Sequence, residues 1–183
     1  MLTVASHLLI DRLWDGGEAW PTERSELTFT LGPEGLSIEI RAPFHGDPPP
    51  TAPPSRTEAL WEYEVVELFL ANATGHYLEL EFGPHGHHLA LLFSGIRQLS
   101  RHDIPVTFQA RIDGDSWRGS AQVAASYLPE QIHRANAYAI HGQEDRRRFL
   151  AAAPVPGPRP DFHQPQLFPP LPTTPLSSPA IRP

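Results

Sequence analysis

The chain contains neither cysteine nor lysine. Without cysteine it can form no disulfide, no thiolate metal site and no cysteine nucleophile. Its 14 basic residues are all arginines, and 21 acidic residues give a net charge of -7. Sequence-independent binding of nucleic acid needs clustered positive charge to displace counterions from phosphates. The composition therefore argues against a nucleic-acid partner.

Long apolar segments are also missing. No run approaches the roughly 18 apolar residues that a membrane-spanning helix needs. The N-terminal stretch MLTVASHLLIDRLWDGG has no basic leader, and Asp11 and Arg12 interrupt its apolar part before a signal sequence is complete. We therefore expect a soluble, cytoplasmic protein with no membrane association.

Proline is abundant and unevenly placed. Of 22 prolines, five lie within residues 47–54 and 11 lie from residue 154 onward. Residues 169–183 lack apolar periodicity and are rich in proline, which is typical of an extended or disordered segment. We predict one domain over residues 1–168 and a tail over residues 169–183.

Within the domain, apolar and polar residues alternate with a period of two, as they do in half-buried strands. Residues 124–134 are the exception and favour a short helical turn. The alternation predicts strands over residues 26–31, 36–40, 63–70, 77–82, 88–93, 105–112, 117–123 and 136–142. About eight or nine short strands joined by Gly, Pro and Asn turns predict an all-β antiparallel sandwich or barrel.

The strand over residues 77–82 carries an acidic face. Side chains alternate across a strand, so Tyr77, Glu79 and Glu81 share one face while the leucines point to the core. The same rule places Glu67, in the preceding strand, on the side of these glutamates. We expect this acidic face to be accessible to solvent.

The turn after this strand sets the pairing of its neighbour. If residues 83–86 form a four-residue hairpin loop, Phe82 pairs with His87 and Glu81 pairs with His88. That register directs Leu89, Leu91 and Phe93 toward the core.

Three carboxylates on one face repel one another unless cations, hydrogen-bond donors or shared protons offset their charge. Such a face would suit a hydroxyl-rich ligand. Its carboxylates can accept hydrogen bonds from sugar hydroxyls, an arginine can donate to them, and an aromatic ring can pack on the sugar. We predict a non-catalytic binding face for a small polar ligand, with a saccharide favoured. Its candidate residues are Glu67, Tyr77, Glu79, Glu81, His88, Arg97 and Trp117.

Other interpretations stay open. The acidic face could serve only solubility and edge protection. Glu67, Glu79 and His88 could perform acid–base chemistry of the glycosidase type, or the protein could be an interaction scaffold. We expect no metal or cofactor, because the turn histidines His85, His87 and His88 lack ligands from a second element.

Several segments resemble, in order, an uncharacterised protein family found from bacteria to animals. They are APFHGDPPP (42–50), WEYEVVELFLAN (61–72), YLELEFGPHGHHLALLFSGIR (77–97), ANAYAIHG (135–142) and PDFHQPQLF (160–168). That family is similar to family 9 carbohydrate-binding modules and DOMON-like domains. The resemblance implies a β-sandwich of jelly-roll type. It also implies that Glu67, Tyr77 and Glu79 lie near a ligand, and it implies the same less strongly for Arg97 and Trp117.

Overall fold

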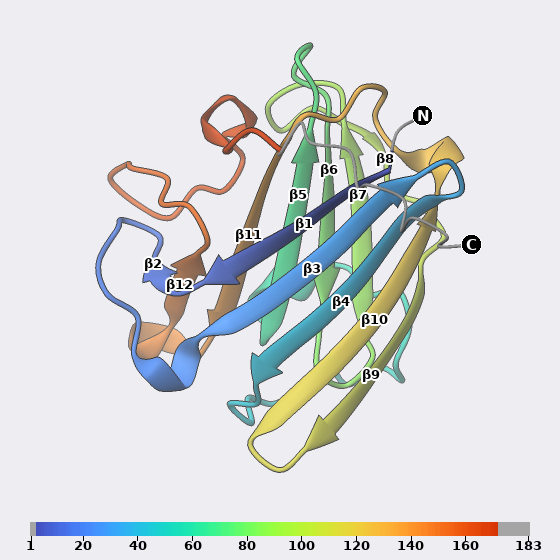
Figure 1. Cartoon of the computed structure of the whole chain (residues 1–183). Coiled ribbons are helices and arrows are strands. Elements are labelled where there is room, and N and C mark those ends of the chain that lie inside the picture. The colour runs from blue at the N-terminus through green and yellow to red at the C-terminus, as the bar shows by residue number, and fades with distance from the viewer. Residues whose placement is uncertain (1–2, 172–183) are drawn as a thin grey trace, which may run out of the picture.

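The computed structural model of the protein describes residues 3–171. Across these residues the chain forms 12 strands in two antiparallel sheets, which pack face to face (Figure 1). The strand spacing predicted an antiparallel sandwich or barrel, and the sandwich is confirmed. No helix within residues 3–171 has the length and apolar character needed to cross a bilayer.

The first sheet has five strands in the order β1-β3-β4-β10-β9. Their bounds are β1 Val4–Ile10, β3 Ser25–Gly32, β4 Gly35–Pro43, β10 Ser116–Ala124 and β9 Thr107–Asp113. Strict alternation explains why they form a sheet with one buried side: along β10 every second residue is buried and the others are exposed.

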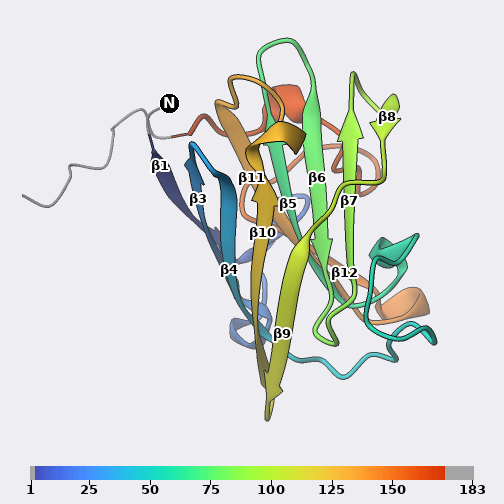
Figure 2. The same ribbon diagram turned by 90° about the vertical axis from the view of Figure 1, so that its right-hand side faces the viewer.

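The second sheet has seven strands in the order β2-β12-β11-β5-β6-β7-β8. Their bounds are β2 Arg12–Leu13, β12 Arg148–Ala151, β11 Arg134–His141, β5 Val65–Ala71, β6 Tyr77–Phe82, β7 His88–Phe93 and β8 Leu99–Arg101. Figure 2 shows the two sheets as separate layers. The side chains of the main core pack between them.

Short 3-10 helices occupy the connections. They are η1 Pro21–Glu23, η2 Leu60–Glu62, η3 Ala125–Tyr127, η4 Glu144–Arg146 and η5 Pro165–Leu167. The helical turn expected within residues 124–134 is η3.

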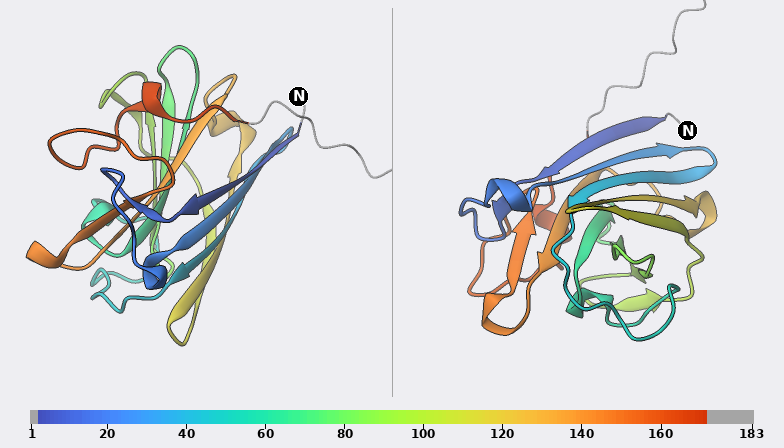
Figure 3. Two further views of the ribbon diagram at one scale, coloured as in Figure 1. Left: turned by 60° about the vertical axis from the view of Figure 1, so that its left-hand side comes forward. Right: turned by 90° about the horizontal axis from the view of Figure 1, so that it is seen from below.

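The central strands of the seven-stranded sheet are buried on both faces, unlike those of the first sheet. Every residue of β5 and of β6 is buried. Their inner face meets the other sheet, while residues around η2 and residues 152–171 cover the outer face (Figure 3). Leu60, Phe162 and Phe168 anchor these covering segments in a second apolar cluster with Phe69 and Tyr138.

The predicted hairpin register was wrong by one residue. Phe82 pairs with His88, and the Gly83 N–H donates to the His87 carbonyl at 2.9 Å, so the loop holds five residues. A shift of one residue turns every side chain to the other face. Leu89, Leu91 and Phe93 therefore lie on the outer face with the glutamates, instead of in the core between the sheets.

The sequence pattern missed four strands, β1, β2, β8 and β12. Residues 169–171 pack against β11: the Ala135 N–H donates to the Pro169 carbonyl at 3.1 Å, and the Leu171 N–H donates to the His133 carbonyl at 2.7 Å. The rest of the predicted tail, residues 172–183, lies outside the described residues.

Candidate functional site

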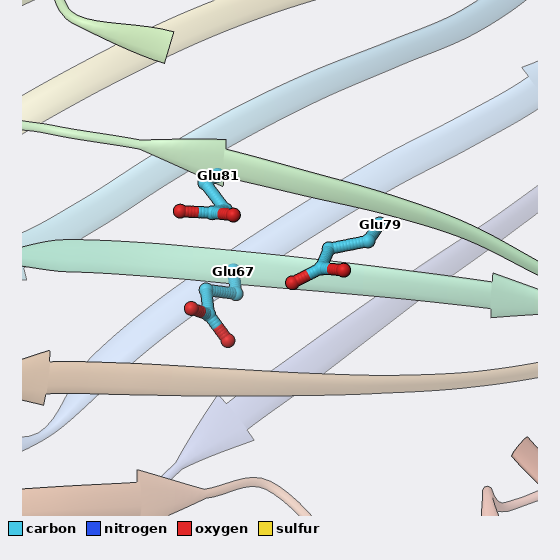
Figure 4. Close-up of side chains that lie close together, drawn as sticks. All are labelled: Glu67, Glu79 and Glu81. Carbon is cyan, nitrogen blue, oxygen red and sulfur yellow. The ribbon is translucent and has the colours of Figure 1, made fainter. Parts of the chain in front are cut away.

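Three glutamates converge on the outer face of the seven-stranded sheet. The antiparallel pairing of β5 with β6 places Glu67 directly opposite Glu81, and Glu79 lies two residues before Glu81 on β6. Each glutamate contributes one carboxylate oxygen to a group of three oxygens that all lie within 4.8 Å of one another (Figure 4). The prediction that these three side chains share a face is confirmed.

The face itself is not open to solvent, and that expectation was wrong. Glu67 is 1% exposed, Glu79 is 4% exposed and Glu81 is fully buried. The cause is the covering layer formed by the segments around η2 and after β12. The three glutamates therefore form a buried acidic cluster, which we call the Glu cluster.

Burial dominates the electrostatics of the Glu cluster. It raises the pKa of Glu67 and of Glu81 well above the usual value, and the neighbouring carboxylates raise both further. Burial also raises the pKa of Glu79 to about 8, against the opposing charge of Arg97. The backbone N–H of Trp61 acts in the opposite direction and lowers the pKa of Glu81, but its effect is smaller than that of burial. It forms no hydrogen bond with either Glu81 oxygen. Unless a cation is bound, the cluster holds protons at neutral pH.

Glu79 connects the Glu cluster to a cleft of about 470 Å³ at the surface. Trp61, which is 43% exposed, offers an aromatic ring to this cleft. Arg147 holds the Trp61 segment by donating to the carbonyl oxygens of Trp61 and Glu62. The cleft is lined by Trp61, Glu79, Leu91, Phe93, Arg97, Leu99, Phe149, Pro160, Asp161, Phe162 and His163.

Arg97 is fixed at the cleft by the turn between β7 and β8. Its φ of 56° is left-handed, and its backbone N–H donates to the Tyr77 hydroxyl at 3.0 Å. Its guanidinium donates to Asp161 Oδ1 at 2.8 Å. Arg97 is thus held at both ends, with most of its side chain still exposed, at 59%.

The Tyr77 hydroxyl also lies 2.7 Å from His163 Nδ1. Because this oxygen already accepts from Arg97, its own proton is available to donate to Nδ1, and we assign the His163 proton to Nε2 on that ground. Burial, followed by the charge of Arg97, lowers the pKa of His163 to about 4, and burial raises the pKa of Tyr77 to about 12. Both groups are therefore neutral at physiological pH. His163 Nε2 lies 3.8 Å from Glu79 Oε2.

Two predicted site residues lie elsewhere. Trp117 is buried on β10, in the core between the sheets, because its place in the alternation of β10 points it inward. Because the hairpin loop has five residues instead of four, His88 pairs with Phe82. The His88 side chain therefore points inward, as that of Phe82 does, and away from the face that carries Glu81. Of the seven predicted residues, Glu67, Tyr77, Glu79, Glu81 and Arg97 are brought together.

The cleft also contains residues that the sequence pattern did not predict for the site, among them Trp61, Phe149, Asp161 and His163. Trp61 and the segment PDFHQPQLF both belong to the stretches that resemble the family. The proline-rich composition around Asp161 and His163 indicated a loop, and nothing in a strand pattern predicts that such a loop returns to cover a sheet.

A larger hollow of about 660 Å³ lies at the ends of β4 and β10, with Arg24, Arg41 and Arg118 on its rim. These arginines are exposed, and Trp117 beneath them is only 1% exposed. The hollow therefore offers no tryptophan face to a ligand and no buried polar group. We take the smaller cleft at Glu79 as the candidate site.

Curated sequences from vertebrates match the chain. The mouse UPF0462 protein C4orf33 homolog is 40% identical over 173 residues, which cover 88% of each chain. The chain belongs to the UPF0462 family. The human protein C4orf33 is 39% identical over 84% of this chain and 81% of its own length. No family model matches the chain.

Solved structures agree on the fold. A candidate carbohydrate-binding protein from Bacteroides uniformis superposes with a TM-score of 0.64 at 16% identity, over 89% of this chain and 84% of that one. A family 9 carbohydrate-binding module from Caldicellulosiruptor kristjanssonii, in complex with cellotriose, superposes with a TM-score of 0.50 at 10% identity. The match covers 81% of this chain and 72% of that one. The chain therefore has a fold like that of family 9 carbohydrate-binding modules, as the resemblance implied.

Proposed function

We propose that the protein is a non-catalytic binding module for a saccharide, which it holds in the cleft at Glu79. The observation that carries the proposal is the meeting of three kinds of group in one cleft: the exposed ring of Trp61, the carboxyl of Glu79 and the guanidinium of Arg97. A ring packs on the C–H face of a sugar, while carboxyl and guanidinium groups bond its hydroxyls.

The fold supports the same ligand class. One structural neighbour is described as a candidate carbohydrate-binding protein, and another was solved in complex with cellotriose. The fixed backbone of Arg97 adds to this support, because a preorganised donor loses little freedom when a ligand binds.

Acid–base catalysis by Glu67, Glu79 and His88 has less support. His88 points to the opposite side of the sheet, and Glu67 does not line the cleft. Acid–base catalysis needs its groups within reach of one substrate, and only Glu79 of these three lines the cleft.

Isothermal titration of the full chain with cellotriose, glucose and a panel of other oligosaccharides tests the proposal. We expect at least one saccharide to bind, and Trp61→Ala to weaken its binding about two- to tenfold, since a stacking ring contributes about 0.5–1.5 kcal/mol. Trp20→Ala is the matched control, because Trp20 is 58% exposed and lies outside the cleft. Binding by none of the saccharides, or equal binding by the wild type and Trp61→Ala, would count against the proposal.

A further inference from the structure

The Glu cluster has a feature that saccharide binding does not use. Four of its six carboxylate oxygens are buried without a hydrogen-bond partner: Oε2 of Glu67, Oε2 of Glu79, and both oxygens of Glu81. Polar atoms buried in this way are rare in folded proteins, and each one costs stability. Glu81 is fully buried and directs its carboxylate toward the other two (Figure 4).

No positive side chain in the described part of the chain neutralises the cluster through a direct bond. The guanidinium of Arg97 is bonded to Asp161, and that of Arg147 is bonded to backbone carbonyls. The nearest basic group is His163, whose Nε2 is 3.8 Å from Glu79 and which is held neutral by its surroundings. Three carboxylates thus face one another with no partner of opposite charge.

The geometry suits a cation. Oxygens from three different side chains lie within 4.8 Å of one another, so a single ion placed between them could contact all three. A site built only of carboxylate oxygens, without nitrogen or sulfur, selects hard divalent ions over zinc or copper. Glu79 lines the cleft, which gives an ion a route from solvent.

We propose that Glu67, Glu79 and Glu81 bind one divalent cation of the oxygen-preferring class, Ca²⁺, Mg²⁺ or Mn²⁺. A bound ion would supply the missing partners of the buried oxygens and reduce three negative charges to one. The proposal departs from the expectation of no metal, which was argued from the histidines of the turn; this site uses none of those histidines. The inference does not depend on a saccharide in the cleft.

Thermal unfolding of the full chain tests it. The protein is stripped with EDTA, dialysed, and melted with 1 mM CaCl₂, MgCl₂ or MnCl₂ in turn. A ligand that binds only the folded state at about 100 times its dissociation constant raises the melting temperature of a chain of this size by about 5 °C or more. We expect such a rise with at least one of the three ions.

Glu81→Gln is the decisive variant, because Glu81 contributes to the cluster without lining the cleft. It should lose most of the cation-dependent rise, while Glu62→Gln, at an exposed position in η2, should keep it. Trp61→Ala should also keep it, which separates this result from the saccharide test. No rise with any of the ions, or an equal rise in Glu81→Gln, would overturn the proposal.

A second measurement covers the case in which Glu81→Gln fails to fold. Electron paramagnetic resonance of the wild type titrated with Mn²⁺ counts bound ions directly. We expect one Mn²⁺ per chain, displaced by an excess of Ca²⁺ or Mg²⁺. The absence of bound Mn²⁺, together with no thermal shift, leaves shared protons as the way in which the cluster is neutralised.

Discussion

Glu67 on β5 lies directly opposite Glu81 on β6, and both are shielded from solvent, with exposures of 1% and 0%. Like charges opposite each other destabilise a sheet even at the surface. In the interior the cost grows, because an ionised carboxylate also loses its hydration. The packing of the surrounding apolar residues must offset this cost, and the Glu cluster is therefore a local source of instability in the metal-free protein.

The first prediction follows from that cost. In chelating buffer at pH 8, Glu67→Gln should raise the free energy of unfolding by about 1–3 kcal/mol. At that pH the Glu67 carboxyl group must either take up a proton on folding or be buried as a charge. Glutamine has the same shape and requires neither. Urea denaturation followed by tryptophan fluorescence measures the change.

Leu80→Ala is the comparison for this variant. Leu80 is fully buried on the opposite face of β6, and its truncation should cost about 2–5 kcal/mol by leaving a cavity. If Glu67→Gln were as destabilising as Leu80→Ala, the carboxyl group would be making a favourable interaction that glutamine cannot make, and it would not be a source of instability.

The second prediction concerns the covering layer. Phe168 is fully buried, and its ring centroid lies 5.7 Å from that of Phe69. Phe168→Ala should therefore cost about 3–5 kcal/mol in urea denaturation, whereas Leu167→Ala, at a site 46% exposed, should change stability by less than about 0.5 kcal/mol. Similar small effects for both variants would show that this segment does not pack on the sheet.

The alternation of residue types was enough to predict β6 and β7 with their observed bounds, but not the register between them. In β7, Leu89, Leu91 and Phe93 lie on one face and Ala90 and Leu92 on the other. A strand that is buried on both sides is apolar on both sides, so its pattern fits a four-residue or a five-residue loop equally well. The observed pairing of Phe82 with His88 and the hydrogen bond between Gly83 and His87 distinguish the two.

The cleft was harder to predict than the sheet. Trp61 precedes β5 and His163 follows β12, so the two meet only because separate loops fold back over the same sheet face. Such contacts between distant parts of the chain leave no periodic signal in the sequence. The glutamates were found because strand alternation alone places Glu79 and Glu81 on one face.

The third prediction tests the support of Arg97. Tyr77→Phe removes the oxygen that accepts from the Arg97 backbone and bonds to His163. Loss of these bonds should lower the free energy of unfolding by about 1–3 kcal/mol and weaken saccharide binding about fivefold or more through displacement of Arg97. Denaturation and isothermal titration measure the two effects.

Tyr63→Phe is the control for this substitution, because it removes a phenol that does not line the cleft. It should leave saccharide affinity unchanged. A Tyr77→Phe protein with wild-type stability would show that the hydroxyl does not hold Arg97 and His163 in place, whatever the ligand.

The fourth prediction concerns acid stability and rests on Glu23, which is 2% exposed. Burial alone would raise the pKa of Glu23, but hydrogen bonds from Arg148 and from the Trp20 N–H outweigh it and hold this pKa below the usual 4.5. The unfolded chain therefore takes up the proton first as pH falls, so the stability from this group is complete above about pH 4.5 and is lost below it.

Glu23→Gln should cost about 3 kcal/mol at pH 7, because it leaves Arg148 without its charged partner, and the difference from wild type should shrink at pH 3.5. Exposed Glu26→Gln should show neither effect in urea denaturation at the two pH values. A gap that stayed constant between the two pH values would show that the ionised form of Glu23 does not carry this stability.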